Sequence, residues 1–223
     1  MKKFIKAMLR KLVGRFTVVS RAKSLPKNTK YYSPFVEWDD IGYKTGVLII
    51  QKEPQFRTVI GGDARYFLPF PYSVFIIRFI RKPSSDKDKK DFYYEFRSLQ
   101  VGFISDELKT PNDEIAPLPL SNYEEGDGLT YLRICMGNTF GKPRYSDLQG
   151  LVDGVIGAFW QTSFTALNPR IMQNWTKLSI KDVWSSLYGV PGEQPWTRHG
   201  ASAAARRAKI KELVNIPFGV EEF

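Results

Sequence analysis

The chain has 223 residues, of which 43% are hydrophobic and 25% charged, and its formal net charge is +10 at pH 7. This composition excludes a wholly disordered chain, and the length is sufficient to bury a core without disulfides or metals. The single cysteine, Cys135, excludes an internal disulfide and favours a reducing compartment. The sequence contains no run of about 18 apolar residues, so it predicts no membrane-spanning helix.

The positive charge is concentrated at the two ends of the chain. Residues 1–30 contain ten bases and no acid, and residues 198–223 contain five bases and three acids. Residues 31–197 hold 18 bases and 20 acids, so the body is nearly neutral. We therefore predict that the ends contact a nucleic acid or an acidic protein partner. The candidate binding residues are Lys2, Lys3, Lys6, Arg10, Lys11, Arg15, Arg21, Lys23, Lys27, Lys30, Arg206 and Arg207.

Residues 1–16 have the pattern of a basic amphipathic helix, with apolar residues at helical spacing and bases on the opposite face. Lys6 and Arg10 would interrupt the hydrophobic region of a secretory signal, and Met1 argues against a cleaved transit peptide. Three interpretations stay open: a helix on a membrane surface, a helix docked on protein with its bases toward nucleic acid, and a solvated, half-ordered arm.

Prolines and small polar residues at residues 20–34 predict a linker or extended arm that leads into the body. We therefore divide the chain into a basic arm at residues 1–34 and a single domain at residues 35–223.

The first half of the body predicts an antiparallel sheet. Residues 72–81 are apolar on both alternating faces, as expected for a central strand that is covered on both sides. A charged loop at residues 83–91 joins this strand to a partner strand at residues 92–104. Ahead of this hairpin, residues 46–52 and 56–60 predict a hairpin-like unit, and residues 66–71 form an aromatic segment interrupted by prolines.

The second half predicts a long loop at residues 105–128, a short strand at residues 129–136 and then helices. A capping box at residues 146–149 begins the first helix, and its glycines predict close approach by another backbone. The other helices are predicted from residue 179 to Gly189 and over residues 201–215. Because the strands precede the helices, we predict an α+β fold with a central antiparallel sheet and a C-terminal helical layer.

Motifs for catalysis and cofactor binding are scarce. The chain has no phosphate-binding loop motif, and Cys135 and His199 alone do not make a zinc site. A catalytic triad would have to use His199, which lies in a polar turn. The paired carboxylates at residues 39–40 and 124–125 are typical of solvated loops. We therefore predict no cofactor and no metal, and favour a non-enzymatic protein.

Aromatic residues follow basic segments at two places, which can indicate stacking on single-stranded nucleic acid. Packing in the core or in an interface is the alternative, and the sequence favours it. These residues are Tyr31, Tyr32, Phe35 and Trp38 after the arm, and Phe92, Tyr93 and Tyr94 after the lysine-rich loop.

Cys135 lies between Ile134 and Met136 on the predicted short strand, which favours a buried, inert thiol over a nucleophile. The surrounding sequence also bears on its role. The relevant segments are Pro117-Leu118-Pro119, Asn122-Tyr123, residues 134–138, Phe159-Trp160 and residues 163–165.

These segments resemble a prokaryotic family, the ubiquitin-conjugating-enzyme-like proteins of plasmids and phages that include PRTRC-type protein B, over residues 70–170. The resemblance implies a related α+β fold, an origin in a phage or mobile element, and a transferase that uses Cys135 as its nucleophile.

Taken together, the sequence favours a structural or assembly protein of a phage or mobile element. Its basic arm would contact nucleic acid or an acidic partner subunit, in the cytoplasm or in a virion, and a homo-oligomer is compatible with this function. Two alternatives stay open: a conjugating-enzyme-like transferase using Cys135, and a peripheral membrane protein anchored by residues 1–16.

Overall fold

The computed structural model describes the sheet, the helices that cover it and part of the C-terminal region. The predicted helix at residues 1–16 lies outside the described residues. The structure describes residues 25–38, 44–61, 64–83, 92–117, 132–136, 140–141, 143–164, 169–188 and 207–214.

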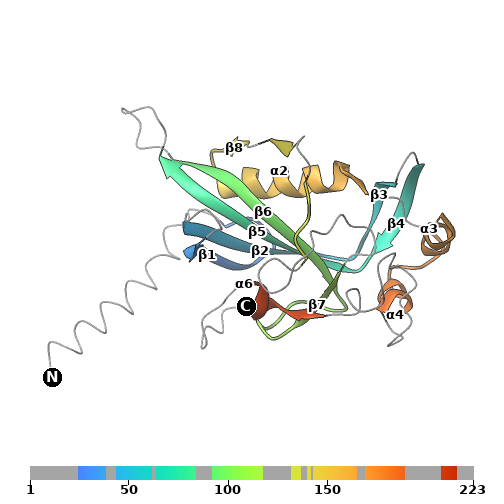
Figure 1. Ribbon diagram of the computed structural model, residues 1–223. Coiled ribbons are helices and arrows are strands. Elements are labelled where there is room, and N and C mark those ends of the chain that lie inside the picture. The colour runs from blue at the N-terminus through green and yellow to red at the C-terminus, as the bar shows by residue number, and fades with distance from the viewer. Residues whose placement is uncertain are drawn as a thin grey trace, which may run out of the picture.

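Within these ranges the protein is an α+β protein built mainly from antiparallel sheet (Figure 1). The strands are β1 (Thr29–Trp38), β2 (Lys44–Lys52), β3 (Gln55–Gly61), β4 (Ala64–Phe70), β5 (Tyr72–Pro83), β6 (Phe92–Ile104), β7 (Glu114–Pro117), β8 (Arg144–Tyr145), β9 (Ser163–Phe164) and β10 (Ala208–Lys209). The helices are α2 (Leu148–Gln161), α3 (Pro169–Trp175), α4 (Val183–Tyr188) and α6 (Ile210–Val214).

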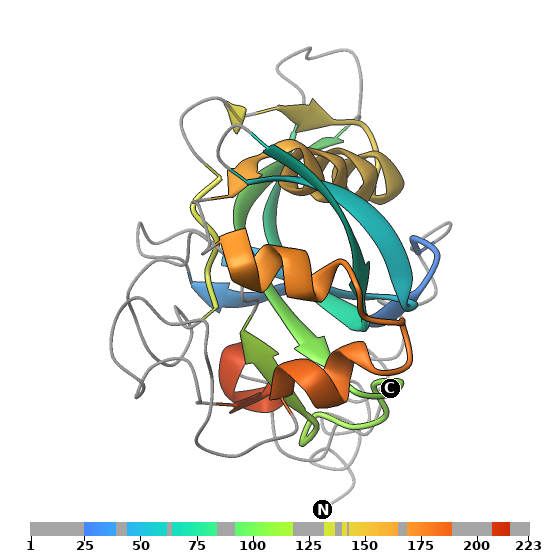
Figure 2. The same cartoon turned by 90° about the vertical axis from the view of Figure 1, so that its right-hand side faces the viewer.

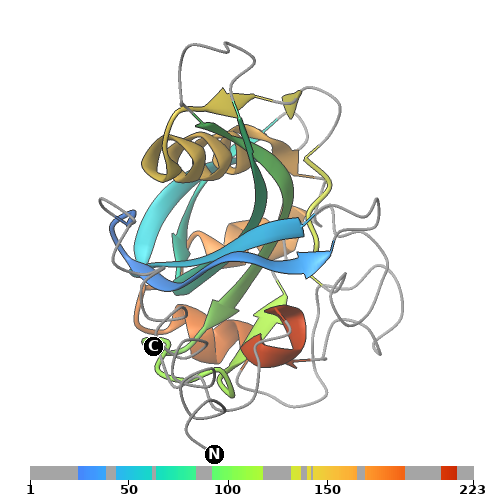
Figure 3. The same ribbon diagram turned by 90° about the vertical axis from the view of Figure 1, so that its left-hand side faces the viewer.

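The main sheet is centred on β5. Its described strands run in the order β1-β2-β5-β6-β7-β10, with β8 also paired to β6. On β5, Phe75 and Ile77 face one hydrophobic core, Val74 and Ile76 face the other, and all four are fully buried. The predicted central strand, its double burial and its antiparallel partner β6 are therefore confirmed. Figure 3 shows β1 and β2 crossing β5 and β6 at a steep angle, as expected for a strongly twisted sheet.

A smaller sheet lies at one side of the main sheet (Figure 2). Within the described residues its order is β4-β3-β9, and β9 joins β3 in parallel, with Ser163 opposite Ile60. The prediction that residues 46–52 and 56–60 form one hairpin is wrong, because β2 pairs with β1 and β5 whereas β3 pairs with β4. The chain changes sheets at Pro54, which has no N–H to continue a ladder.

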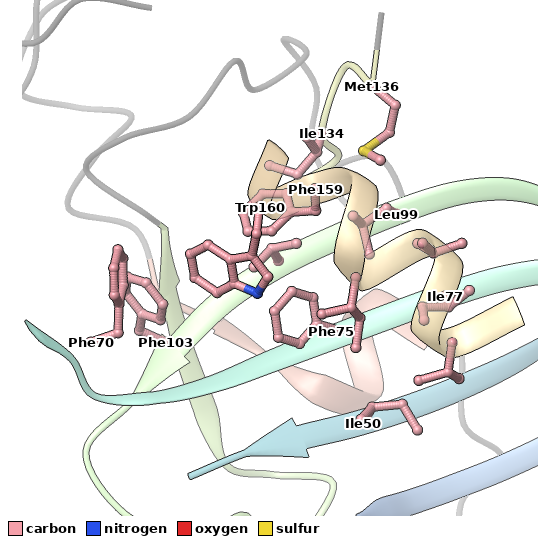
Figure 4. Close-up of a cluster of buried hydrophobic side chains, with 14 of the residues drawn as sticks. Ile50, Phe70, Phe75, Ile77, Leu99, Phe103, Ile134, Met136, Phe159 and Trp160 are labelled. Atoms are coloured by element: carbon pink, nitrogen blue, oxygen red, sulfur yellow. The ribbon is translucent and has the colours of Figure 1, made fainter. Parts of the chain in front are cut away.

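Helix α2 and the smaller sheet cover the first core, as Figure 4 shows for the end of the helix. The ring centroids of Phe159 and Trp160 lie 5.6 and 6.1 Å from that of Phe75. The N-cap is Asp147, whose Oδ1 accepts a hydrogen bond of 2.7 Å from the N–H of Gly150. The predicted capping box had Ser146 as the N-cap, one residue earlier. The negative charge of Asp147 also interacts favourably with the positive end of the helix dipole.

A glycine in α2 permits close packing of β8 on the helix. A Cβ at Gly154 would lie 2.5 Å from the hydroxyl oxygen of Tyr145 and 2.6 Å from its Cε1. The predicted close approach is therefore made by a side chain and not by another backbone. At Gly157 no atom of the described residues lies within 4 Å of such a Cβ.

The second core lies on the opposite face of the main sheet and is covered by the C-terminal segment. Strand β10 pairs with β7, with Ala208 opposite Ile115, and α6 follows directly with Ile210, Leu213 and Val214 buried. The predicted helix over residues 201–215 is wrong where residues 208–209 are extended. Tertiary pairing with β7 outweighs the helix propensity of this alanine-rich stretch.

Arg78 connects α6 to the centre of the sheet. Its side chain is 6% exposed and donates hydrogen bonds to Gln100 Oε1 and to the backbone oxygen of Leu213. A guanidinium buried among apolar side chains needs such acceptors. The contact therefore joins β5, β6 and α6.

Four further differences concern which elements form and where they begin. Strand β1 begins at Thr29, within the predicted linker, and β7 lies within the predicted loop at residues 105–128. The described part of the predicted strand at 129–136 is not an extended strand, and it pairs with β6 through the bridge between Arg133 and Gln100. Helix α3 was not predicted.

Across the described ranges, no helix is both long enough and apolar enough to span a membrane.

Candidate functional site

Three of the twelve predicted binding bases lie within the described residues, namely Lys27, Lys30 and Arg207. Lys30 forms an ion pair with Glu107, and the guanidinium of Arg207 lies 5.7 Å from the ring centroid of Trp184. Lys27 is exposed. No contact recorded between described residues brings these three bases together, and the other nine lie outside the described ranges.

The arm joins the body beside the first turn of α2. The backbone N–H of Lys27 donates to Gln149 Oε1 at 3.4 Å, and the carbonyl of Asn28 accepts from the N–H of Gln51 at 3.1 Å. Asn28 has a φ of 66°, a left-handed conformation that asparagine tolerates. Pro26 is buried. Among the described residues, the contacts that join the arm to the body begin at Pro26, so a truncation that removes the arm should stop before it.

A second basic surface lies where β5 ends, β6 begins and β8 pairs with β6. We call this surface the ribbon end and define it as Arg81, Lys82, Phe92, Tyr93 and Arg144. Figure 1 shows the paired ends of β5 and β6 extending past the start of α2. Arg81 and Phe92 are exposed on one face of this ribbon, and Arg144 is exposed on the other.

Each face of the ribbon end carries an arginine stacked on an aromatic ring. The guanidinium carbon of Arg81 lies 3.8 Å from the ring centroid of Phe92, and that of Arg144 lies 4.7 Å from the centroid of Tyr93. Phe92 and Tyr93 are neighbours on β6, so they point to opposite faces of the ribbon. Phe92 is 44% exposed, so the stack is open to solvent.

The ribbon end has a surplus of positive charge. Glu95 is nearly buried and pairs with Lys82 at 2.9 Å and with Arg97 at 3.6 Å. Among the described residues, no carboxylate forms an ion pair with Arg81 or Arg144. Both guanidinium groups lie instead over the rings of Phe92 and Tyr93.

Two tyrosines beside the ribbon end are neutral near pH 7. Burial raises the pKa of Tyr32, the nearby Tyr94 raises it further, and Arg81 lowers it. Burial also raises the pKa of Tyr145. Neither hydroxyl therefore offsets the positive charge of the surface.

The side chains of the ribbon end are suited to binding an anionic ligand that carries flat rings. A guanidinium that lies flat on a ring can still donate its in-plane N–H groups to phosphate oxygens. The exposed side of the aromatic ring can stack on a nucleobase. In the part of the chain that the structure describes, no group of three His, Cys, Asp or Glu side chains is arranged to hold a metal ion.

Cys135 is exposed, so the prediction of a buried thiol is wrong. Ile134 and Met136 both belong to the first core, and Figure 4 shows them at its margin. Ile134 is held against β6 by the hydrogen bond from its N–H to the carbonyl of Leu99, at 2.8 Å. Side chains alternate along an extended segment, so the residue between two inward-facing neighbours points outward.

Sequence reasoning did not identify Arg81 and Arg144. It noted the aromatic residues after the lysine-rich loop but favoured packing for them. Tyr94 does pack, with its ring centroid 5.6 Å from that of Phe79, whereas Phe92 is exposed. Arg81 could have been found from the predicted hairpin. It is a basic residue just before the lysine-rich loop, and its strand pairs with the strand that carries the aromatic residues after the loop.

Comparison with protein-family models, curated proteins and solved structures finds no match to this chain.

Proposed function

We propose that this protein is a non-enzymatic interaction protein of a phage or mobile element, with an assembly role, that binds nucleic acid through its basic N-terminal arm. The observation that carries the proposal is the segregation of charge, with ten bases and no acid in residues 1–30 on a nearly neutral body. Such an arm binds phosphates by releasing condensed counterions, without reading sequence.

The ribbon end supports nucleic acid over an acidic protein subunit as the partner. Arg144 lies four residues before the first turn of α2, and that turn contacts Lys27 at the start of the body. The arm and the stacked Arg144–Tyr93 pair therefore adjoin the same end of one helix. Guanidinium groups on exposed rings suit a ligand that offers both phosphates and flat bases.

The proposal has three finer parts. Residues 1–16 form the amphipathic helix that presents the bases, and the C-terminal helices form a layer over the sheet. The protein acts in the reducing cytoplasm or in a virion, where a free Cys135 is stable.

The decisive experiment compares the intact chain with residues 25–223 for binding to a labelled oligonucleotide over a salt series. The truncation removes eight bases and keeps Pro26. We expect the intact chain to lose affinity steeply with salt, and the truncated chain to bind about 100-fold more weakly at low salt with a shallower slope.

A matched control separates charge from amphipathicity. In this variant the eight bases of residues 1–24 become glutamine and the apolar residues stay. Loss of oligonucleotide binding in the control supports the proposal. Binding that does not depend on salt contradicts it. Binding to anionic vesicles but not to oligonucleotide would replace it with the membrane-surface alternative.

A transferase that uses Cys135 is the second candidate, because the thiol is exposed beside a segment held against β6. On the leading proposal, Cys135 reacts with a thiol reagent in the native protein no faster than free cysteine does. Cys135→Ser then leaves oligonucleotide affinity unchanged and alters stability by less than about 0.5 kcal/mol. A reaction many times faster than that of free cysteine would favour the transferase, since an activated thiolate is its nucleophile.

A further inference from the structure

A stacked pair of phenylalanines lies exposed on the hairpin of β3 and β4, whose strands can be followed in Figure 2. The ring centroids of Phe56 and Phe67 are 5.1 Å apart and the ring planes differ by 14°. Phe56 is 41% and Phe67 60% exposed. Burial in the core therefore does not explain these rings.

The register of the hairpin places both rings on its outer face. Thr58 lies opposite Phe67, and Phe56 lies opposite Pro69, so the two phenylalanines are diagonal neighbours. The opposite face of the hairpin contributes Leu68 and Phe70 to the first core, where both are fully buried. The inner face thus holds the hairpin in place and leaves the outer face available.

A basic residue lies beside the pair. Arg65 is exposed and shares the outer face of the hairpin with Phe67, whereas Arg57 lies on the inner face, with its guanidinium carbon 5.7 Å from the ring centroid of Trp160. The described residues of the hairpin contain no acid, although Asp63 lies between its strands in the sequence. The segment from α3 to α4 packs on β4 through the hydrogen bond from Trp175 Nε1 to the carbonyl of Pro69, at 2.9 Å.

That packed segment adds positive charge beside β4. Lys177 and Lys181 are exposed there, and the neighbouring acid is Asp182. Asp182 is already engaged as an acceptor of the Ser179 hydroxyl, at 2.6 Å. The segment therefore adds exposed positive charge to this part of the protein, and Arg65 is the basic residue that shares the outer face of the hairpin with the two rings.

We infer that this hairpin is a base-stacking platform for single-stranded nucleic acid, separate from the arm and from the ribbon end. The inference rests on the proposed function and specifies that the protein binds nucleic acid in its single-stranded form. Bases of a duplex are stacked on one another and present only their edges, whereas unpaired bases offer their faces to exposed aromatic rings. Arg65, on the same face as the rings, supplies the charge that attracts the backbone of the bound strand.

Charge also argues against a second copy of this chain on the same face. In a two-fold symmetric dimer the patch would meet itself, so Arg65 would oppose the like charge of its own copy. An anionic ligand meets no such repulsion.

The test measures fluorescence anisotropy of the full chain with a labelled oligothymidylate of about 20 nucleotides and with a duplex of the same length. We expect Phe67→Ala to weaken binding of the single strand about tenfold, with duplex binding unchanged. Phe56→Ala should act in the same direction. Phe67→Tyr keeps the ring and should retain the affinity. Circular dichroism checks that the variants fold, which the exposure of Phe67 favours.

The outcomes separate this inference from the proposed function. If the intact chain binds the single strand and Phe67→Ala binds it equally well, the platform is overturned and the proposed function stands. If the intact chain binds neither oligonucleotide, both are overturned. If Phe67→Ala dissociates an oligomer in size-exclusion chromatography without changing oligonucleotide affinity, the face contacts another copy and the inference is overturned.

Discussion

Arg78→Met is expected to lower the free energy of unfolding by about 3 kcal/mol, because it leaves buried acceptors without their donor. The guanidinium donates to Gln100 Oε1 and to the backbone oxygen of Leu213, and Gln100 is fully buried. Methionine fills a similar volume but donates nothing. Urea denaturation measures the loss.

The same variant should release α6 from the sheet before the rest of the protein unfolds. Amide hydrogen exchange at residues 210–214 is expected to accelerate more than exchange in β5. Arg81→Met is the matched control, since it makes the same change on the same strand at an exposed position. We expect the control to cost less than about 1 kcal/mol. Equal losses in the two variants would show that Arg78 does not anchor α6.

The local sequence pattern was sufficient to predict those elements whose own apolar residues show which of their faces are buried. The two apolar faces of β5 indicated a strand between two cores, and its partner β6 followed from the loop between them. The apolar face of α2 was equally visible. In these elements the periodicity of the side chains matches the environment on each side.

Elements that form through contacts with residues far away in the sequence could not be predicted from the local pattern. Strand β10 is two residues long and exists because Ala208 pairs with Ile115, whereas the alanine-rich sequence around it favours helix. Helix α3 has seven residues, which is too short to be stable alone. The sheet change at Pro54 likewise depends on which strand β3 meets.

The candidate site was predicted only in part, for a similar reason. The bases of the arm are contiguous in the sequence, so their charge could be read directly. Arg144 reaches Tyr93 because β8 pairs with β6, and Phe67 reaches Phe56 because of the register of β3 and β4. Such pairs are set by sheet register, which residue type alone does not specify. For Cys135, alternation along the segment pointed outward, but the apolar neighbours were weighed more heavily.

Trp175→Ala is expected to destabilise the protein by about 4 kcal/mol, the largest effect that we predict for a single substitution. The side chain is 1% exposed, and its ring centroid lies 5.4 Å from that of Phe70. Its Nε1–H donates to the carbonyl of Pro69 at 2.9 Å. Alanine would remove the ring and leave a cavity between α3 and β4. It would also leave the buried carbonyl of Pro69 without its hydrogen-bond donor.

Two matched variants separate these contributions in urea denaturation. Trp175→Phe keeps most of the ring contact but loses the hydrogen bond, so we expect a cost of about 1–2 kcal/mol. Trp184→Ala removes an indole that is only partly buried, and it should cost less than Trp175→Ala. If Trp175→Ala and Trp184→Ala cost the same, α3 does not depend on its tryptophan. If Trp175→Phe costs as much as Trp175→Ala, the hydrogen bond to Pro69 and not the packing holds α3 on the smaller sheet.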